Sequence, residues 1–388
     1  MIPYARQSIT QEDIKAVNKV LRSKFLTQGP LIQNFEKSVA KYTKTKYSVA
    51  VNSATSGLHI ACMALGVKKG DYVWTSVNTF VASANCALYC GAKVDLVDID
   101  PSTYNIDTFN LESKLQKAKK KNKLPKVVIV VHFAGQPCDM EKIFDLSKKY
   151  NFKIIEDASH AIGATYNSKK KKTIKIGSCV HSDITIFSFH PVKIITTAEG
   201  GMALTNRKDL FNKMKVLRSH GITKEIEKKK TNMRPWLYEQ ISLGYNYRMN
   251  EIQAALGCEQ LKRIDNFILR RHVLADRYNK KLSNLPINLP AKIPDTYSSF
   301  HLYVISLSEN LKKSMRLKIF KKMRKKGIEV NFHYIPVHMH PYYKNLGFKK
   351  GDYPVAENYY ERAMSIPIFP SLSKENQNYI IECLNKCF

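Results

Sequence analysis

The sequence predicts an α/β fold, with a large domain built on a mainly parallel sheet and a smaller α+β domain after it. Three observations support this prediction. Short apolar runs rich in β-branched residues, of which 127–131 (VVIVV) is the clearest, alternate with helical patterns from residue 47 to about residue 220. Near residue 250 the alternation stops and a long helical pattern begins. A length of 388 residues also leaves room for two or three domains.

The first element is an amphipathic helix predicted over residues 9–24. Thr10 is a suitable N-cap residue, and Glu12 and Asp13 place negative charge in the first turn, where the helix dipole favours it. A second helix is expected over residues 31–42.

Strands and helices then alternate through the rest of the large domain. The expected strands are 47–53, 71–76, 93–100, 126–133, 152–157, 183–189 and 201–206. The expected helices are 54–65, 79–90, 110–121, 140–150 and 210–220. Ligands bind beyond the carboxyl ends of the strands in such sheets, so the residues that follow these strands are the first candidates for a site.

The smaller domain begins with one long amphipathic helix predicted within residues 250–285. Its apolar residues are separated by gaps of four, five, three and four, and they are Ile252, Leu256, Leu261, Ile264 and Ile268. A strand over 301–307, a helix over 315–327 and a closing helix from Lys374 follow. We therefore expect two domains, 1–255 and 256–388.

The net charge of +31 raises the question of nucleic-acid binding. Only 13 of the 63 basic residues are arginine, the residue that best binds phosphate in a bidentate manner. The lysines cluster at 119–123, 169–172, 228–230 and 321–326, with no interleaved aromatic residues that could stack on bases. We interpret them as a solvated surface, in loops, that can steer anionic substrates, and we expect no nucleic-acid partner.

Several other site classes are not expected. The eight cysteines form no C-x-x-C pair and are predicted to be reduced thiols, mostly buried. His333, His338 and His340 lack a standard metal spacing, so no metal is expected. No apolar run is long enough to span a membrane, and the N-terminus does not resemble a secretory signal, so we expect a cytoplasmic protein without membrane contact.

Two segments that follow strands could bind the ends of a phosphorylated cofactor. Small residues in 52–57 (NSATSG) precede a helix, whose free N–H groups favour a phosphate. An ordinary loop capped by Ser53 is the alternative. Asp157 ends another strand, where its carboxylate could pair with a protonated ring nitrogen, with His160 nearby. A simple helix N-cap is the alternative for Asp157.

Two further residues complete a possible cofactor site. Lys193 follows the strand 183–189 and precedes an apolar, small-residue stretch, and partial burial would make its amine a nucleophile for carbonyl groups. Phe80 could stack on a flat ring, although core packing explains it equally well. A phosphate loop, a carboxylate for a ring nitrogen, an aromatic side chain and a reactive lysine together indicate pyridoxal 5′-phosphate.

The chain resembles the DegT/DnrJ/StrS nucleotide-sugar aminotransferases over nearly its whole length. The motifs occur in family order and are NSATSGL, EDASHA, SFHPVK, TTAEGG, RSHG and GYNYRMNEIQAALG. The resemblance implies the fold-type I (aspartate aminotransferase-like) architecture and dependence on pyridoxal phosphate. Some members of the family are dehydratases with histidine in place of the lysine, so Lys193 favours transamination.

The resemblance also implies roles at the cofactor. Lys193 would bind it covalently, Asp157 would pair with the ring nitrogen, His160 would contact the phenolic oxygen and Phe80 would stack on the ring. The phosphate would be held by Ala54, Thr55, Ser188 and, across a homodimer interface, Asn246.

The substrate implied by the resemblance is a nucleotide-linked sugar. The segments 78–100, 235–251 and 331–343 resemble the transaminases of pseudaminic acid biosynthesis, which implies L-glutamate as donor and C4 of a UDP-linked 4-keto-6-deoxy-N-acetylhexosamine as acceptor. The same chemistry on a dTDP- or GDP-linked 4-keto sugar is the alternative, and a regulatory protein that only binds the cofactor is a further one. The implied sugar-nucleotide contacts are Tyr4, Lys24, Phe25, Leu26, Thr27, Ala54, Ser188, Arg248, His333, His340, Pro341, Tyr342 and Tyr343.

Overall fold

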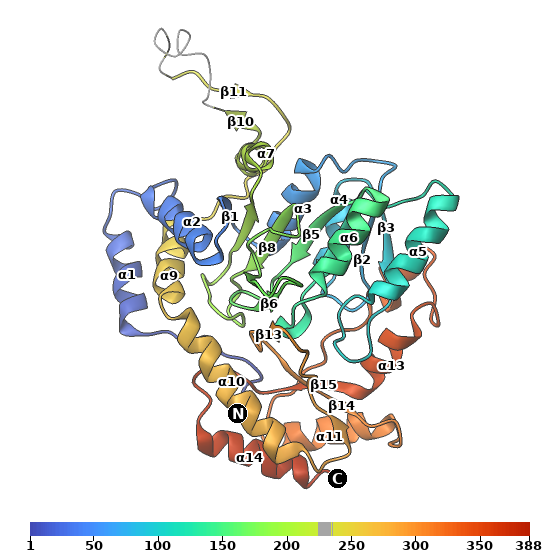
Figure 1. The fold of residues 1–388 in the computed structure, drawn as a ribbon. Helices are drawn as coiled ribbons and strands as arrows, with labels where there is room; N and C mark the ends of the chain where they lie inside the picture. Colours follow the sequence, from blue (N-terminus) through green and yellow to red (C-terminus); the bar gives the residue numbers. More distant parts are fainter. Residues whose placement is uncertain (224–233, 235) are drawn as a thin grey trace.

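The computed structural model describes residues 1–223, 234 and 236–388, and its centre is a seven-stranded sheet (Figure 1). The strand order is β1-β9-β8-β5-β4-β2-β3, and β9 runs in the direction opposite to the other six strands of this sheet. The mainly parallel sheet predicted from the sequence is therefore confirmed. Its strands are β1 (Tyr47–Val51), β2 (Tyr72–Ser76), β3 (Lys93–Val97), β4 (Val127–Val131), β5 (Lys153–Asp157), β8 (Ile184–Ser188) and β9 (Gly201–Thr205).

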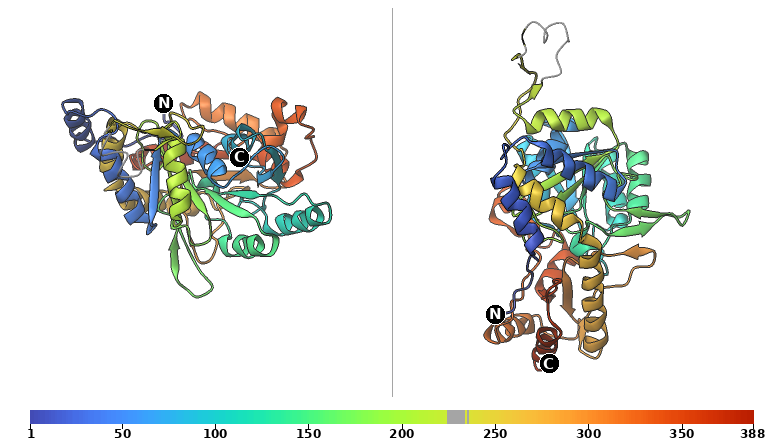
Figure 2. Two further views of the ribbon diagram at one scale, coloured as in Figure 1. Left: turned by 90° about the horizontal axis from the view of Figure 1, so that it is seen from above. Right: turned by 90° about the vertical axis from the view of Figure 1, so that its left-hand side faces the viewer.

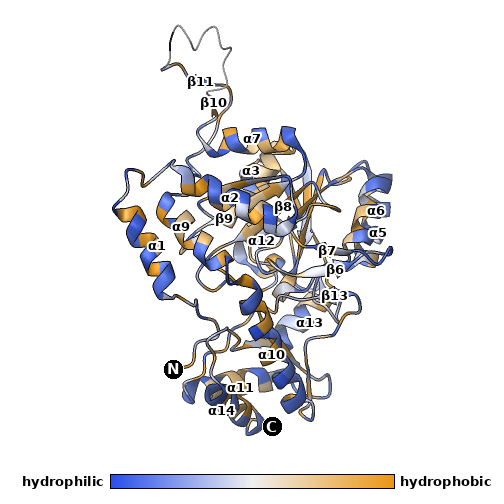
Figure 3. Ribbon diagram, turned by 60° about the vertical axis from the view of Figure 1, so that its left-hand side comes forward, coloured by the Kyte–Doolittle hydropathy of each residue, from blue (hydrophilic) through white to orange (hydrophobic). Residues whose placement is uncertain are grey.

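Helices cover both faces of this sheet, which is why its strands are apolar on both sides. In β4, Val128 and Val130 belong to one apolar cluster, whereas Val127 and Ile129 belong to another on the opposite face. The first cluster receives side chains from α2 (Pro30–Thr43), α5 (Thr108–Lys120), α6 (Met140–Tyr150) and α9 (Glu251–Leu261). The second receives side chains from α3 (Ala54–Ala64), α4 (Ala82–Tyr89) and α7 (Lys208–Arg218). Figure 3 shows the resulting pattern, with apolar strands inside and polar outer helix surfaces.

The predicted first helix is α1 (Gln11–Leu21). The backbone N–H of its N-cap residue Thr10 donates to the carboxylate of Asp13 at 2.8 Å. The same carboxylate is buried and accepts from Arg263 at 2.5 Å, which fastens α1 to the start of the C-terminal region. Asp13 thus serves the packing of α1 as well as its first turn.

The single helix predicted within 250–285 is two helices, α9 and α10 (Ile264–Leu282). The break lies at Lys262 and Arg263, whose backbone N–H groups bond three residues back, to Glu259 and Gln260, instead of continuing the α-helical pattern. In Figure 1, α10 descends from the large sheet towards the C-terminal elements. Ile264 and Ile268 still belong to the core of the large sheet, whereas Leu274 and Tyr278 belong to the C-terminal core.

A second, smaller sheet of three strands lies at the C-terminal end, with order β12-β14-β15. The very start of the chain joins this unit, because Ile2 donates to the carbonyl of Gly327 at 2.7 Å (Figure 2). The predicted domain boundary at 255/256 stays a prediction. From the two cores we propose that the change lies between residues 268 and 274. The elements are β12 (Ile287–Asn288), β14 (Tyr303–Leu307), β15 (Ala363–Ile366), α11 (Ser314–Lys325), α12 (Pro341–Asn345), α13 (Pro354–Arg362) and α14 (Lys374–Asn385).

Two small β structures escaped prediction because each strand has only two or three residues. One is a sheet of β6 (Thr165–Asn167), β7 (Thr173–Lys175) and β13 (Thr296–Tyr297). The other pairs β10 (Ile222–Thr223) with β11 (Glu239–Gln240) in an arm that stands away from the sheet in Figure 1.

The lysine clusters occupy different kinds of structure. Residues 169–172 are exposed in the turn between β6 and β7, as predicted, whereas 119–123 lie at the end of α5 and 321–326 lie mainly within α11. The prediction of loops was therefore wrong for most of 321–326 and partly right for 119–123, of which residues 121–123 follow the end of the helix. Solvated lysines are equally compatible with an exposed helix face. Residues 228–230 lie outside the described part.

The eight cysteines are free thiols, and five of them are buried. Within the described residues, no helix is long and apolar enough to cross a membrane. The cytoplasmic location stays a prediction.

Candidate active site

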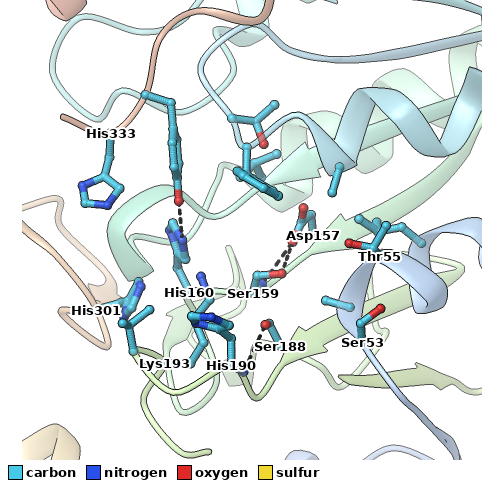
Figure 4. A pocket seen from close by; sticks show the side chains of 18 of the residues that line it. Ser53, Thr55, Asp157, Ser159, His160, Ser188, His190, Lys193, His301 and His333 are labelled. Carbon is cyan, nitrogen blue, oxygen red and sulfur yellow. Dashed lines mark hydrogen bonds between the residues drawn. The ribbon is translucent and has the colours of Figure 1, made fainter. Parts of the chain in front are cut away.

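A pocket of about 580 Å³ lies beyond the carboxyl ends of the parallel strands (Figure 4). Residues that end or follow β1, β2, β4, β5 and β8 line it, together with residues from the C-terminal unit such as His301 and His333. The pocket therefore lies where the two parts of the chain meet. Of the predicted site residues, it is lined by Tyr4, Ala54, Thr55, Phe80, Asp157, His160, Ser188, Lys193 and His333.

The N-terminus of α3 forms one wall of the pocket. The Ser53 side chain caps this helix by accepting from the backbone N–H of Ser56 at 3.1 Å. At the adjoining strand β9, a Cβ atom on Gly201 would lie only 2.6 Å from the backbone nitrogen of Ala54. Glycine at this position thus allows the helix N-terminus, with Ala54 and Thr55, to sit against the sheet and present its free N–H groups to an anion.

Asp157 is held by hydroxyl groups on both of its carboxylate oxygens. Ser83 of α4 donates to Oδ2 at 2.6 Å, and Ser159 donates to Oδ1 through its hydroxyl at 2.6 Å and its backbone N–H at 3.1 Å. The side chain is buried at the end of β5, yet it lines the pocket. These bonds fix the direction of the carboxylate.

Lys193 lies in the turn that follows β8, where its backbone N–H donates to the carbonyl of His190 at 2.9 Å. Burial lowers the pKa of its amine to about 8, and the nearby Asp157 carboxylate opposes this by favouring the charged form. An amine with this pKa is partly neutral at physiological pH, as a nucleophile for carbonyl groups must be.

His160 lines the pocket, and both of its ring nitrogens have partners in the protein. The backbone N–H of Ala134 donates to Nδ1 at 3.2 Å, and Nε2 lies 3.1 Å from the hydroxyl of Tyr334. The predicted contact between His160 and a phenolic oxygen of the cofactor is not tested and stays a prediction.

Three more predicted residues have clear positions. Phe80 is 58% exposed although it is a large apolar residue, and its ring faces that of Tyr334 at 6.1 Å. The ring of Tyr4 lies 5.5 Å from that of His333. Phe80 is therefore not a core residue, which removes the alternative explanation for its position.

The remaining predicted residues lie outside this pocket, in two groups. His340, Pro341, Tyr342 and Tyr343 line a neighbouring hollow of about 550 Å³ with residues of α4. Lys24, Phe25, Leu26 and Thr27 are exposed near the start of α9, where Thr27 pairs with Asn250. Asn246 and Arg248 lie in the segment just before it, and neither lines the pocket of its own chain.

Sequence reasoning missed several residues that line the pocket or hold its groups. Ser83, His301 and Tyr334 reach it only through packing between distant parts of the chain. Burial and the adjacent His160 ring hold the pKa of His301 well below its usual range. Tyr334 directly follows His333, which was predicted as a site residue, so the sequence indicated the right segment but not this tyrosine.

Comparison with known proteins identifies the family. The model of the DegT/DnrJ/EryC1/StrS aminotransferase family matches residues 7–385. The chain belongs to this family. It is 38% identical, over 99% of its length and 96% of the relative's, to a UDP-4-amino-4,6-dideoxy-N-acetyl-beta-L-altrosamine transaminase of Campylobacter jejuni subsp. jejuni serotype O:2.

Solved structures agree with this assignment. Helicobacter pylori PseC, an aminotransferase involved in the biosynthesis of pseudoaminic acid, superposes with a TM-score of 0.89 at 32% identity, covering 100% of this chain and 99% of that one. The PMP-form of the putative sugar aminotransferase Spr1654 from Streptococcus pneumoniae gives 0.90 at 32% identity, covering 100% and 99%. The chain is thus a sugar aminotransferase with the architecture of these enzymes, as predicted.

Members of this family depend on pyridoxal phosphate, and the residues present fit that cofactor. The close approach at Gly201 leaves a helix N-terminus free for a phosphate, Asp157 offers a fixed carboxylate, and Lys193 offers an amine with a lowered pKa. The three groups line one pocket.

Proposed function

We propose that this aminotransferase moves the amino group of L-glutamate to C4 of a UDP-linked 4-keto-6-deoxy-N-acetylhexosamine, giving UDP-4-amino-4,6-dideoxy-N-acetyl-β-L-altrosamine. The placement of Lys193 and Asp157 in one pocket carries the chemical part of the proposal. The 38% identity to the Campylobacter transaminase over nearly both full lengths supports the choice of sugar. A dTDP- or GDP-linked 4-keto sugar is the alternative acceptor.

Each residue has a defined part in this proposal. Pyridoxal phosphate, when bound, supplies an electron sink for the carbon atom that loses or gains a proton. Lys193 would hold the cofactor, and its amine would remove a proton at the α-carbon of the donor and deliver a proton at C4 of the sugar. Asp157 holds a proton at the ring nitrogen, and Ser83 and Ser159 keep its carboxylate in place for that task.

Other pocket residues bind and orient. Ala54, Thr55 and Ser188 would hold the phosphate at the N-terminus of α3, and Phe80 would stack on the ring. Tyr4 and His333 contact the sugar. His333 is neutral at physiological pH, because burial lowers its pKa to about 3, so it acts by hydrogen bonding and not as a cation.

We also propose that two copies of the chain share each site. Asn246, Arg248 and residues 24–27 lie outside the pocket of their own chain. Phe25, Ile241 and Leu243, which are close to these residues in the sequence, are exposed apolar residues. In a homodimer these apolar side chains would be buried, and Asn246 would reach the phosphate of the other subunit.

The experiment follows the nitrogen atom. The protein is incubated with ¹⁵N-labelled L-glutamate and the UDP-linked 4-keto sugar, and the product is analysed by mass spectrometry. We expect the label in the sugar, a parallel-line pattern in initial-velocity kinetics, loss of transfer in Lys193→Ala and normal transfer in the exposed control Lys169→Ala. Substantial transfer by Lys193→Ala would refute the role of that lysine, and transfer only to dTDP- or GDP-sugars would refute the acceptor.

A further inference from the structure

The tautomer of His160 follows from its two hydrogen bonds. A backbone amide can only donate, so the bond from the N–H of Ala134 requires Nδ1 to carry no proton. Burial, with the charge of Lys193, holds the pKa of His160 well below its usual range, so the ring is neutral. Its one proton therefore lies on Nε2.

The loop that carries Ala134 is held firmly, which makes this bond a fixed feature of the site. The backbone N–H of Phe133 donates to the buried side chain of Asn105 at 2.8 Å, and the carbonyl of Ala134 accepts from Leu302. Gly135 approaches Ser299 so closely that a Cβ atom there would lie 2.3 Å from the serine hydroxyl. The amide that sets the tautomer thus has little freedom to turn away.

The protonated Nε2 determines the direction of the Tyr334 hydroxyl. Because Nε2 donates across the 3.1 Å contact, the tyrosine oxygen accepts, and its own hydrogen must point elsewhere. Burial raises the pKa of Tyr334, so this hydrogen is retained. Within the described residues, Oη has no second hydrogen-bond partner. Tyr334 lines the same pocket as Lys193 and Asp157, so a bound molecule is available as acceptor.

We propose that Tyr334 donates its hydroxyl hydrogen to an oxygen atom of the molecule bound beside Lys193, and that His160 is the positioning residue that fixes this donor. The inference rests on the proposed transamination. The acceptor is an electron-rich oxygen, either the phenolic oxygen of the cofactor or an oxygen of the sugar.

Tyr334 is held in a fixed position by contacts of its backbone and its ring. Its backbone N–H donates to Asn78, a fully buried residue, at 3.2 Å. The ring lies against Phe133 in an edge-to-face arrangement at 6.2 Å and against Phe80 at 6.1 Å between ring centroids. A hydroxyl held in this way loses little entropy when it binds an acceptor.

The first test is Tyr334→Phe, which removes the hydroxyl and keeps the ring. If the acceptor belongs to the cofactor, the pH midpoint of the visible spectrum of the cofactor-loaded protein shifts. If it belongs to the sugar, the spectrum is unchanged and KM for the sugar rises roughly three- to tenfold, the value of one hydrogen bond. The control Tyr303→Phe removes a tyrosine hydroxyl that bonds Asn279 outside the pocket, and it should change neither quantity. A Tyr334→Phe variant with unchanged spectrum and KM would overturn the proposal.

The second test changes the positioning residue. Glutamine at position 160 can accept from Ala134 and donate to Tyr334, as histidine does, whereas glutamate can only accept and would take the tyrosine hydrogen away from the pocket. We expect His160→Glu to reproduce the change seen in Tyr334→Phe, and His160→Gln to stay close to the unaltered protein. Equal changes in both variants would show that His160 does not direct the hydroxyl.

A third measurement is independent of the proposed function. Nitrogen NMR of cofactor-free protein labelled at histidine should show His160 protonated at Nε2 alone, and a proton on Nδ1 would overturn the inference. A wrong proposed function would give a different result, because the unaltered protein would then not react with L-glutamate whatever the tautomer of His160.

Discussion

The amine of Lys193 should react with aldehydes in a different pH range from the other lysines. Burial lowers its pKa from 10.5 to about 8. At pH 7 this difference gives roughly 300 times more neutral amine than an ordinary lysine has. Protonation removes the nucleophile, so the rate should fall about tenfold for each pH unit below 8 and level off above it.

The assay uses cofactor-free protein, limiting formaldehyde and cyanoborohydride, with the methylation of each lysine followed by mass spectrometry. Lys193 should show a midpoint near pH 8, well below the ordinary value of about 10.4 for a lysine side chain. Asp157→Asn removes the charge that favours the ammonium form, so the Lys193 midpoint should move to still lower pH. A Lys193 midpoint above pH 10, or an upward shift in Asp157→Asn, would refute the electrostatic reasoning.

Three further predictions concern packing, charge and assembly. Gly201→Ala places a Cβ atom 2.6 Å from the Ala54 nitrogen, so cofactor affinity should fall and stability should drop by about 1–3 kcal/mol in urea unfolding; unchanged affinity would mean that α3 does not hold the phosphate. Burial alone would raise the pKa of the Glu156 carboxyl, but hydrogen bonds lower it overall, and these come from His132, Ser182 and Thr185. The charged carboxylate therefore stabilises the fold at pH values above its pKa in the unfolded chain. This stabilisation is lost as the pH falls through its pKa in the folded protein. Glu156→Gln should therefore cost about 1.5–3 kcal/mol at pH 7, the value of a hydrogen bond to a charged group, and weaken the loss of stability in acid, whereas an unchanged acid transition in chemical denaturation would contradict this. Leu243, which is 74% exposed, should lie in the dimer interface, so Leu243→Glu should shift the protein to monomers in analytical ultracentrifugation while Leu269→Glu on α10 should not; equal behaviour of the two variants would argue against that interface.

The sequence was informative wherever a local rule applied. Parallel strands bring their carboxyl ends to one edge, so the positions of Asp157 and Lys193 after two apolar strands predicted that they would meet, and both line the pocket. The helix break at Lys262 was missed because the apolar spacing continues across it, apart from one gap of five residues.

Contacts between distant segments could not be predicted in this way. Ser83 and Asp157 are 74 residues apart, and His160 and Tyr334 are 174 residues apart. No periodicity connects such pairs. The first contact depends on how α4 packs against the large sheet, and the second depends on how the C-terminal unit packs against that sheet. The tautomer of His160 depends on a backbone amide in a third segment and is therefore visible only in the folded chain.

In the proposed reaction, Lys193 and Asp157 bind and activate a cofactor that accepts an amino group from one substrate and gives it to another. The most direct measurement is the visible absorbance of the cofactor-loaded protein, recorded first with L-glutamate alone and then after addition of the UDP-linked 4-keto-6-deoxy-N-acetylhexosamine. We predict that glutamate bleaches the absorbance and that the sugar, added after free glutamate has been removed, restores it. A protein that takes up no pyridoxal phosphate, or whose absorbance does not respond to glutamate, would contradict the account, and bleaching without recovery would contradict the choice of sugar.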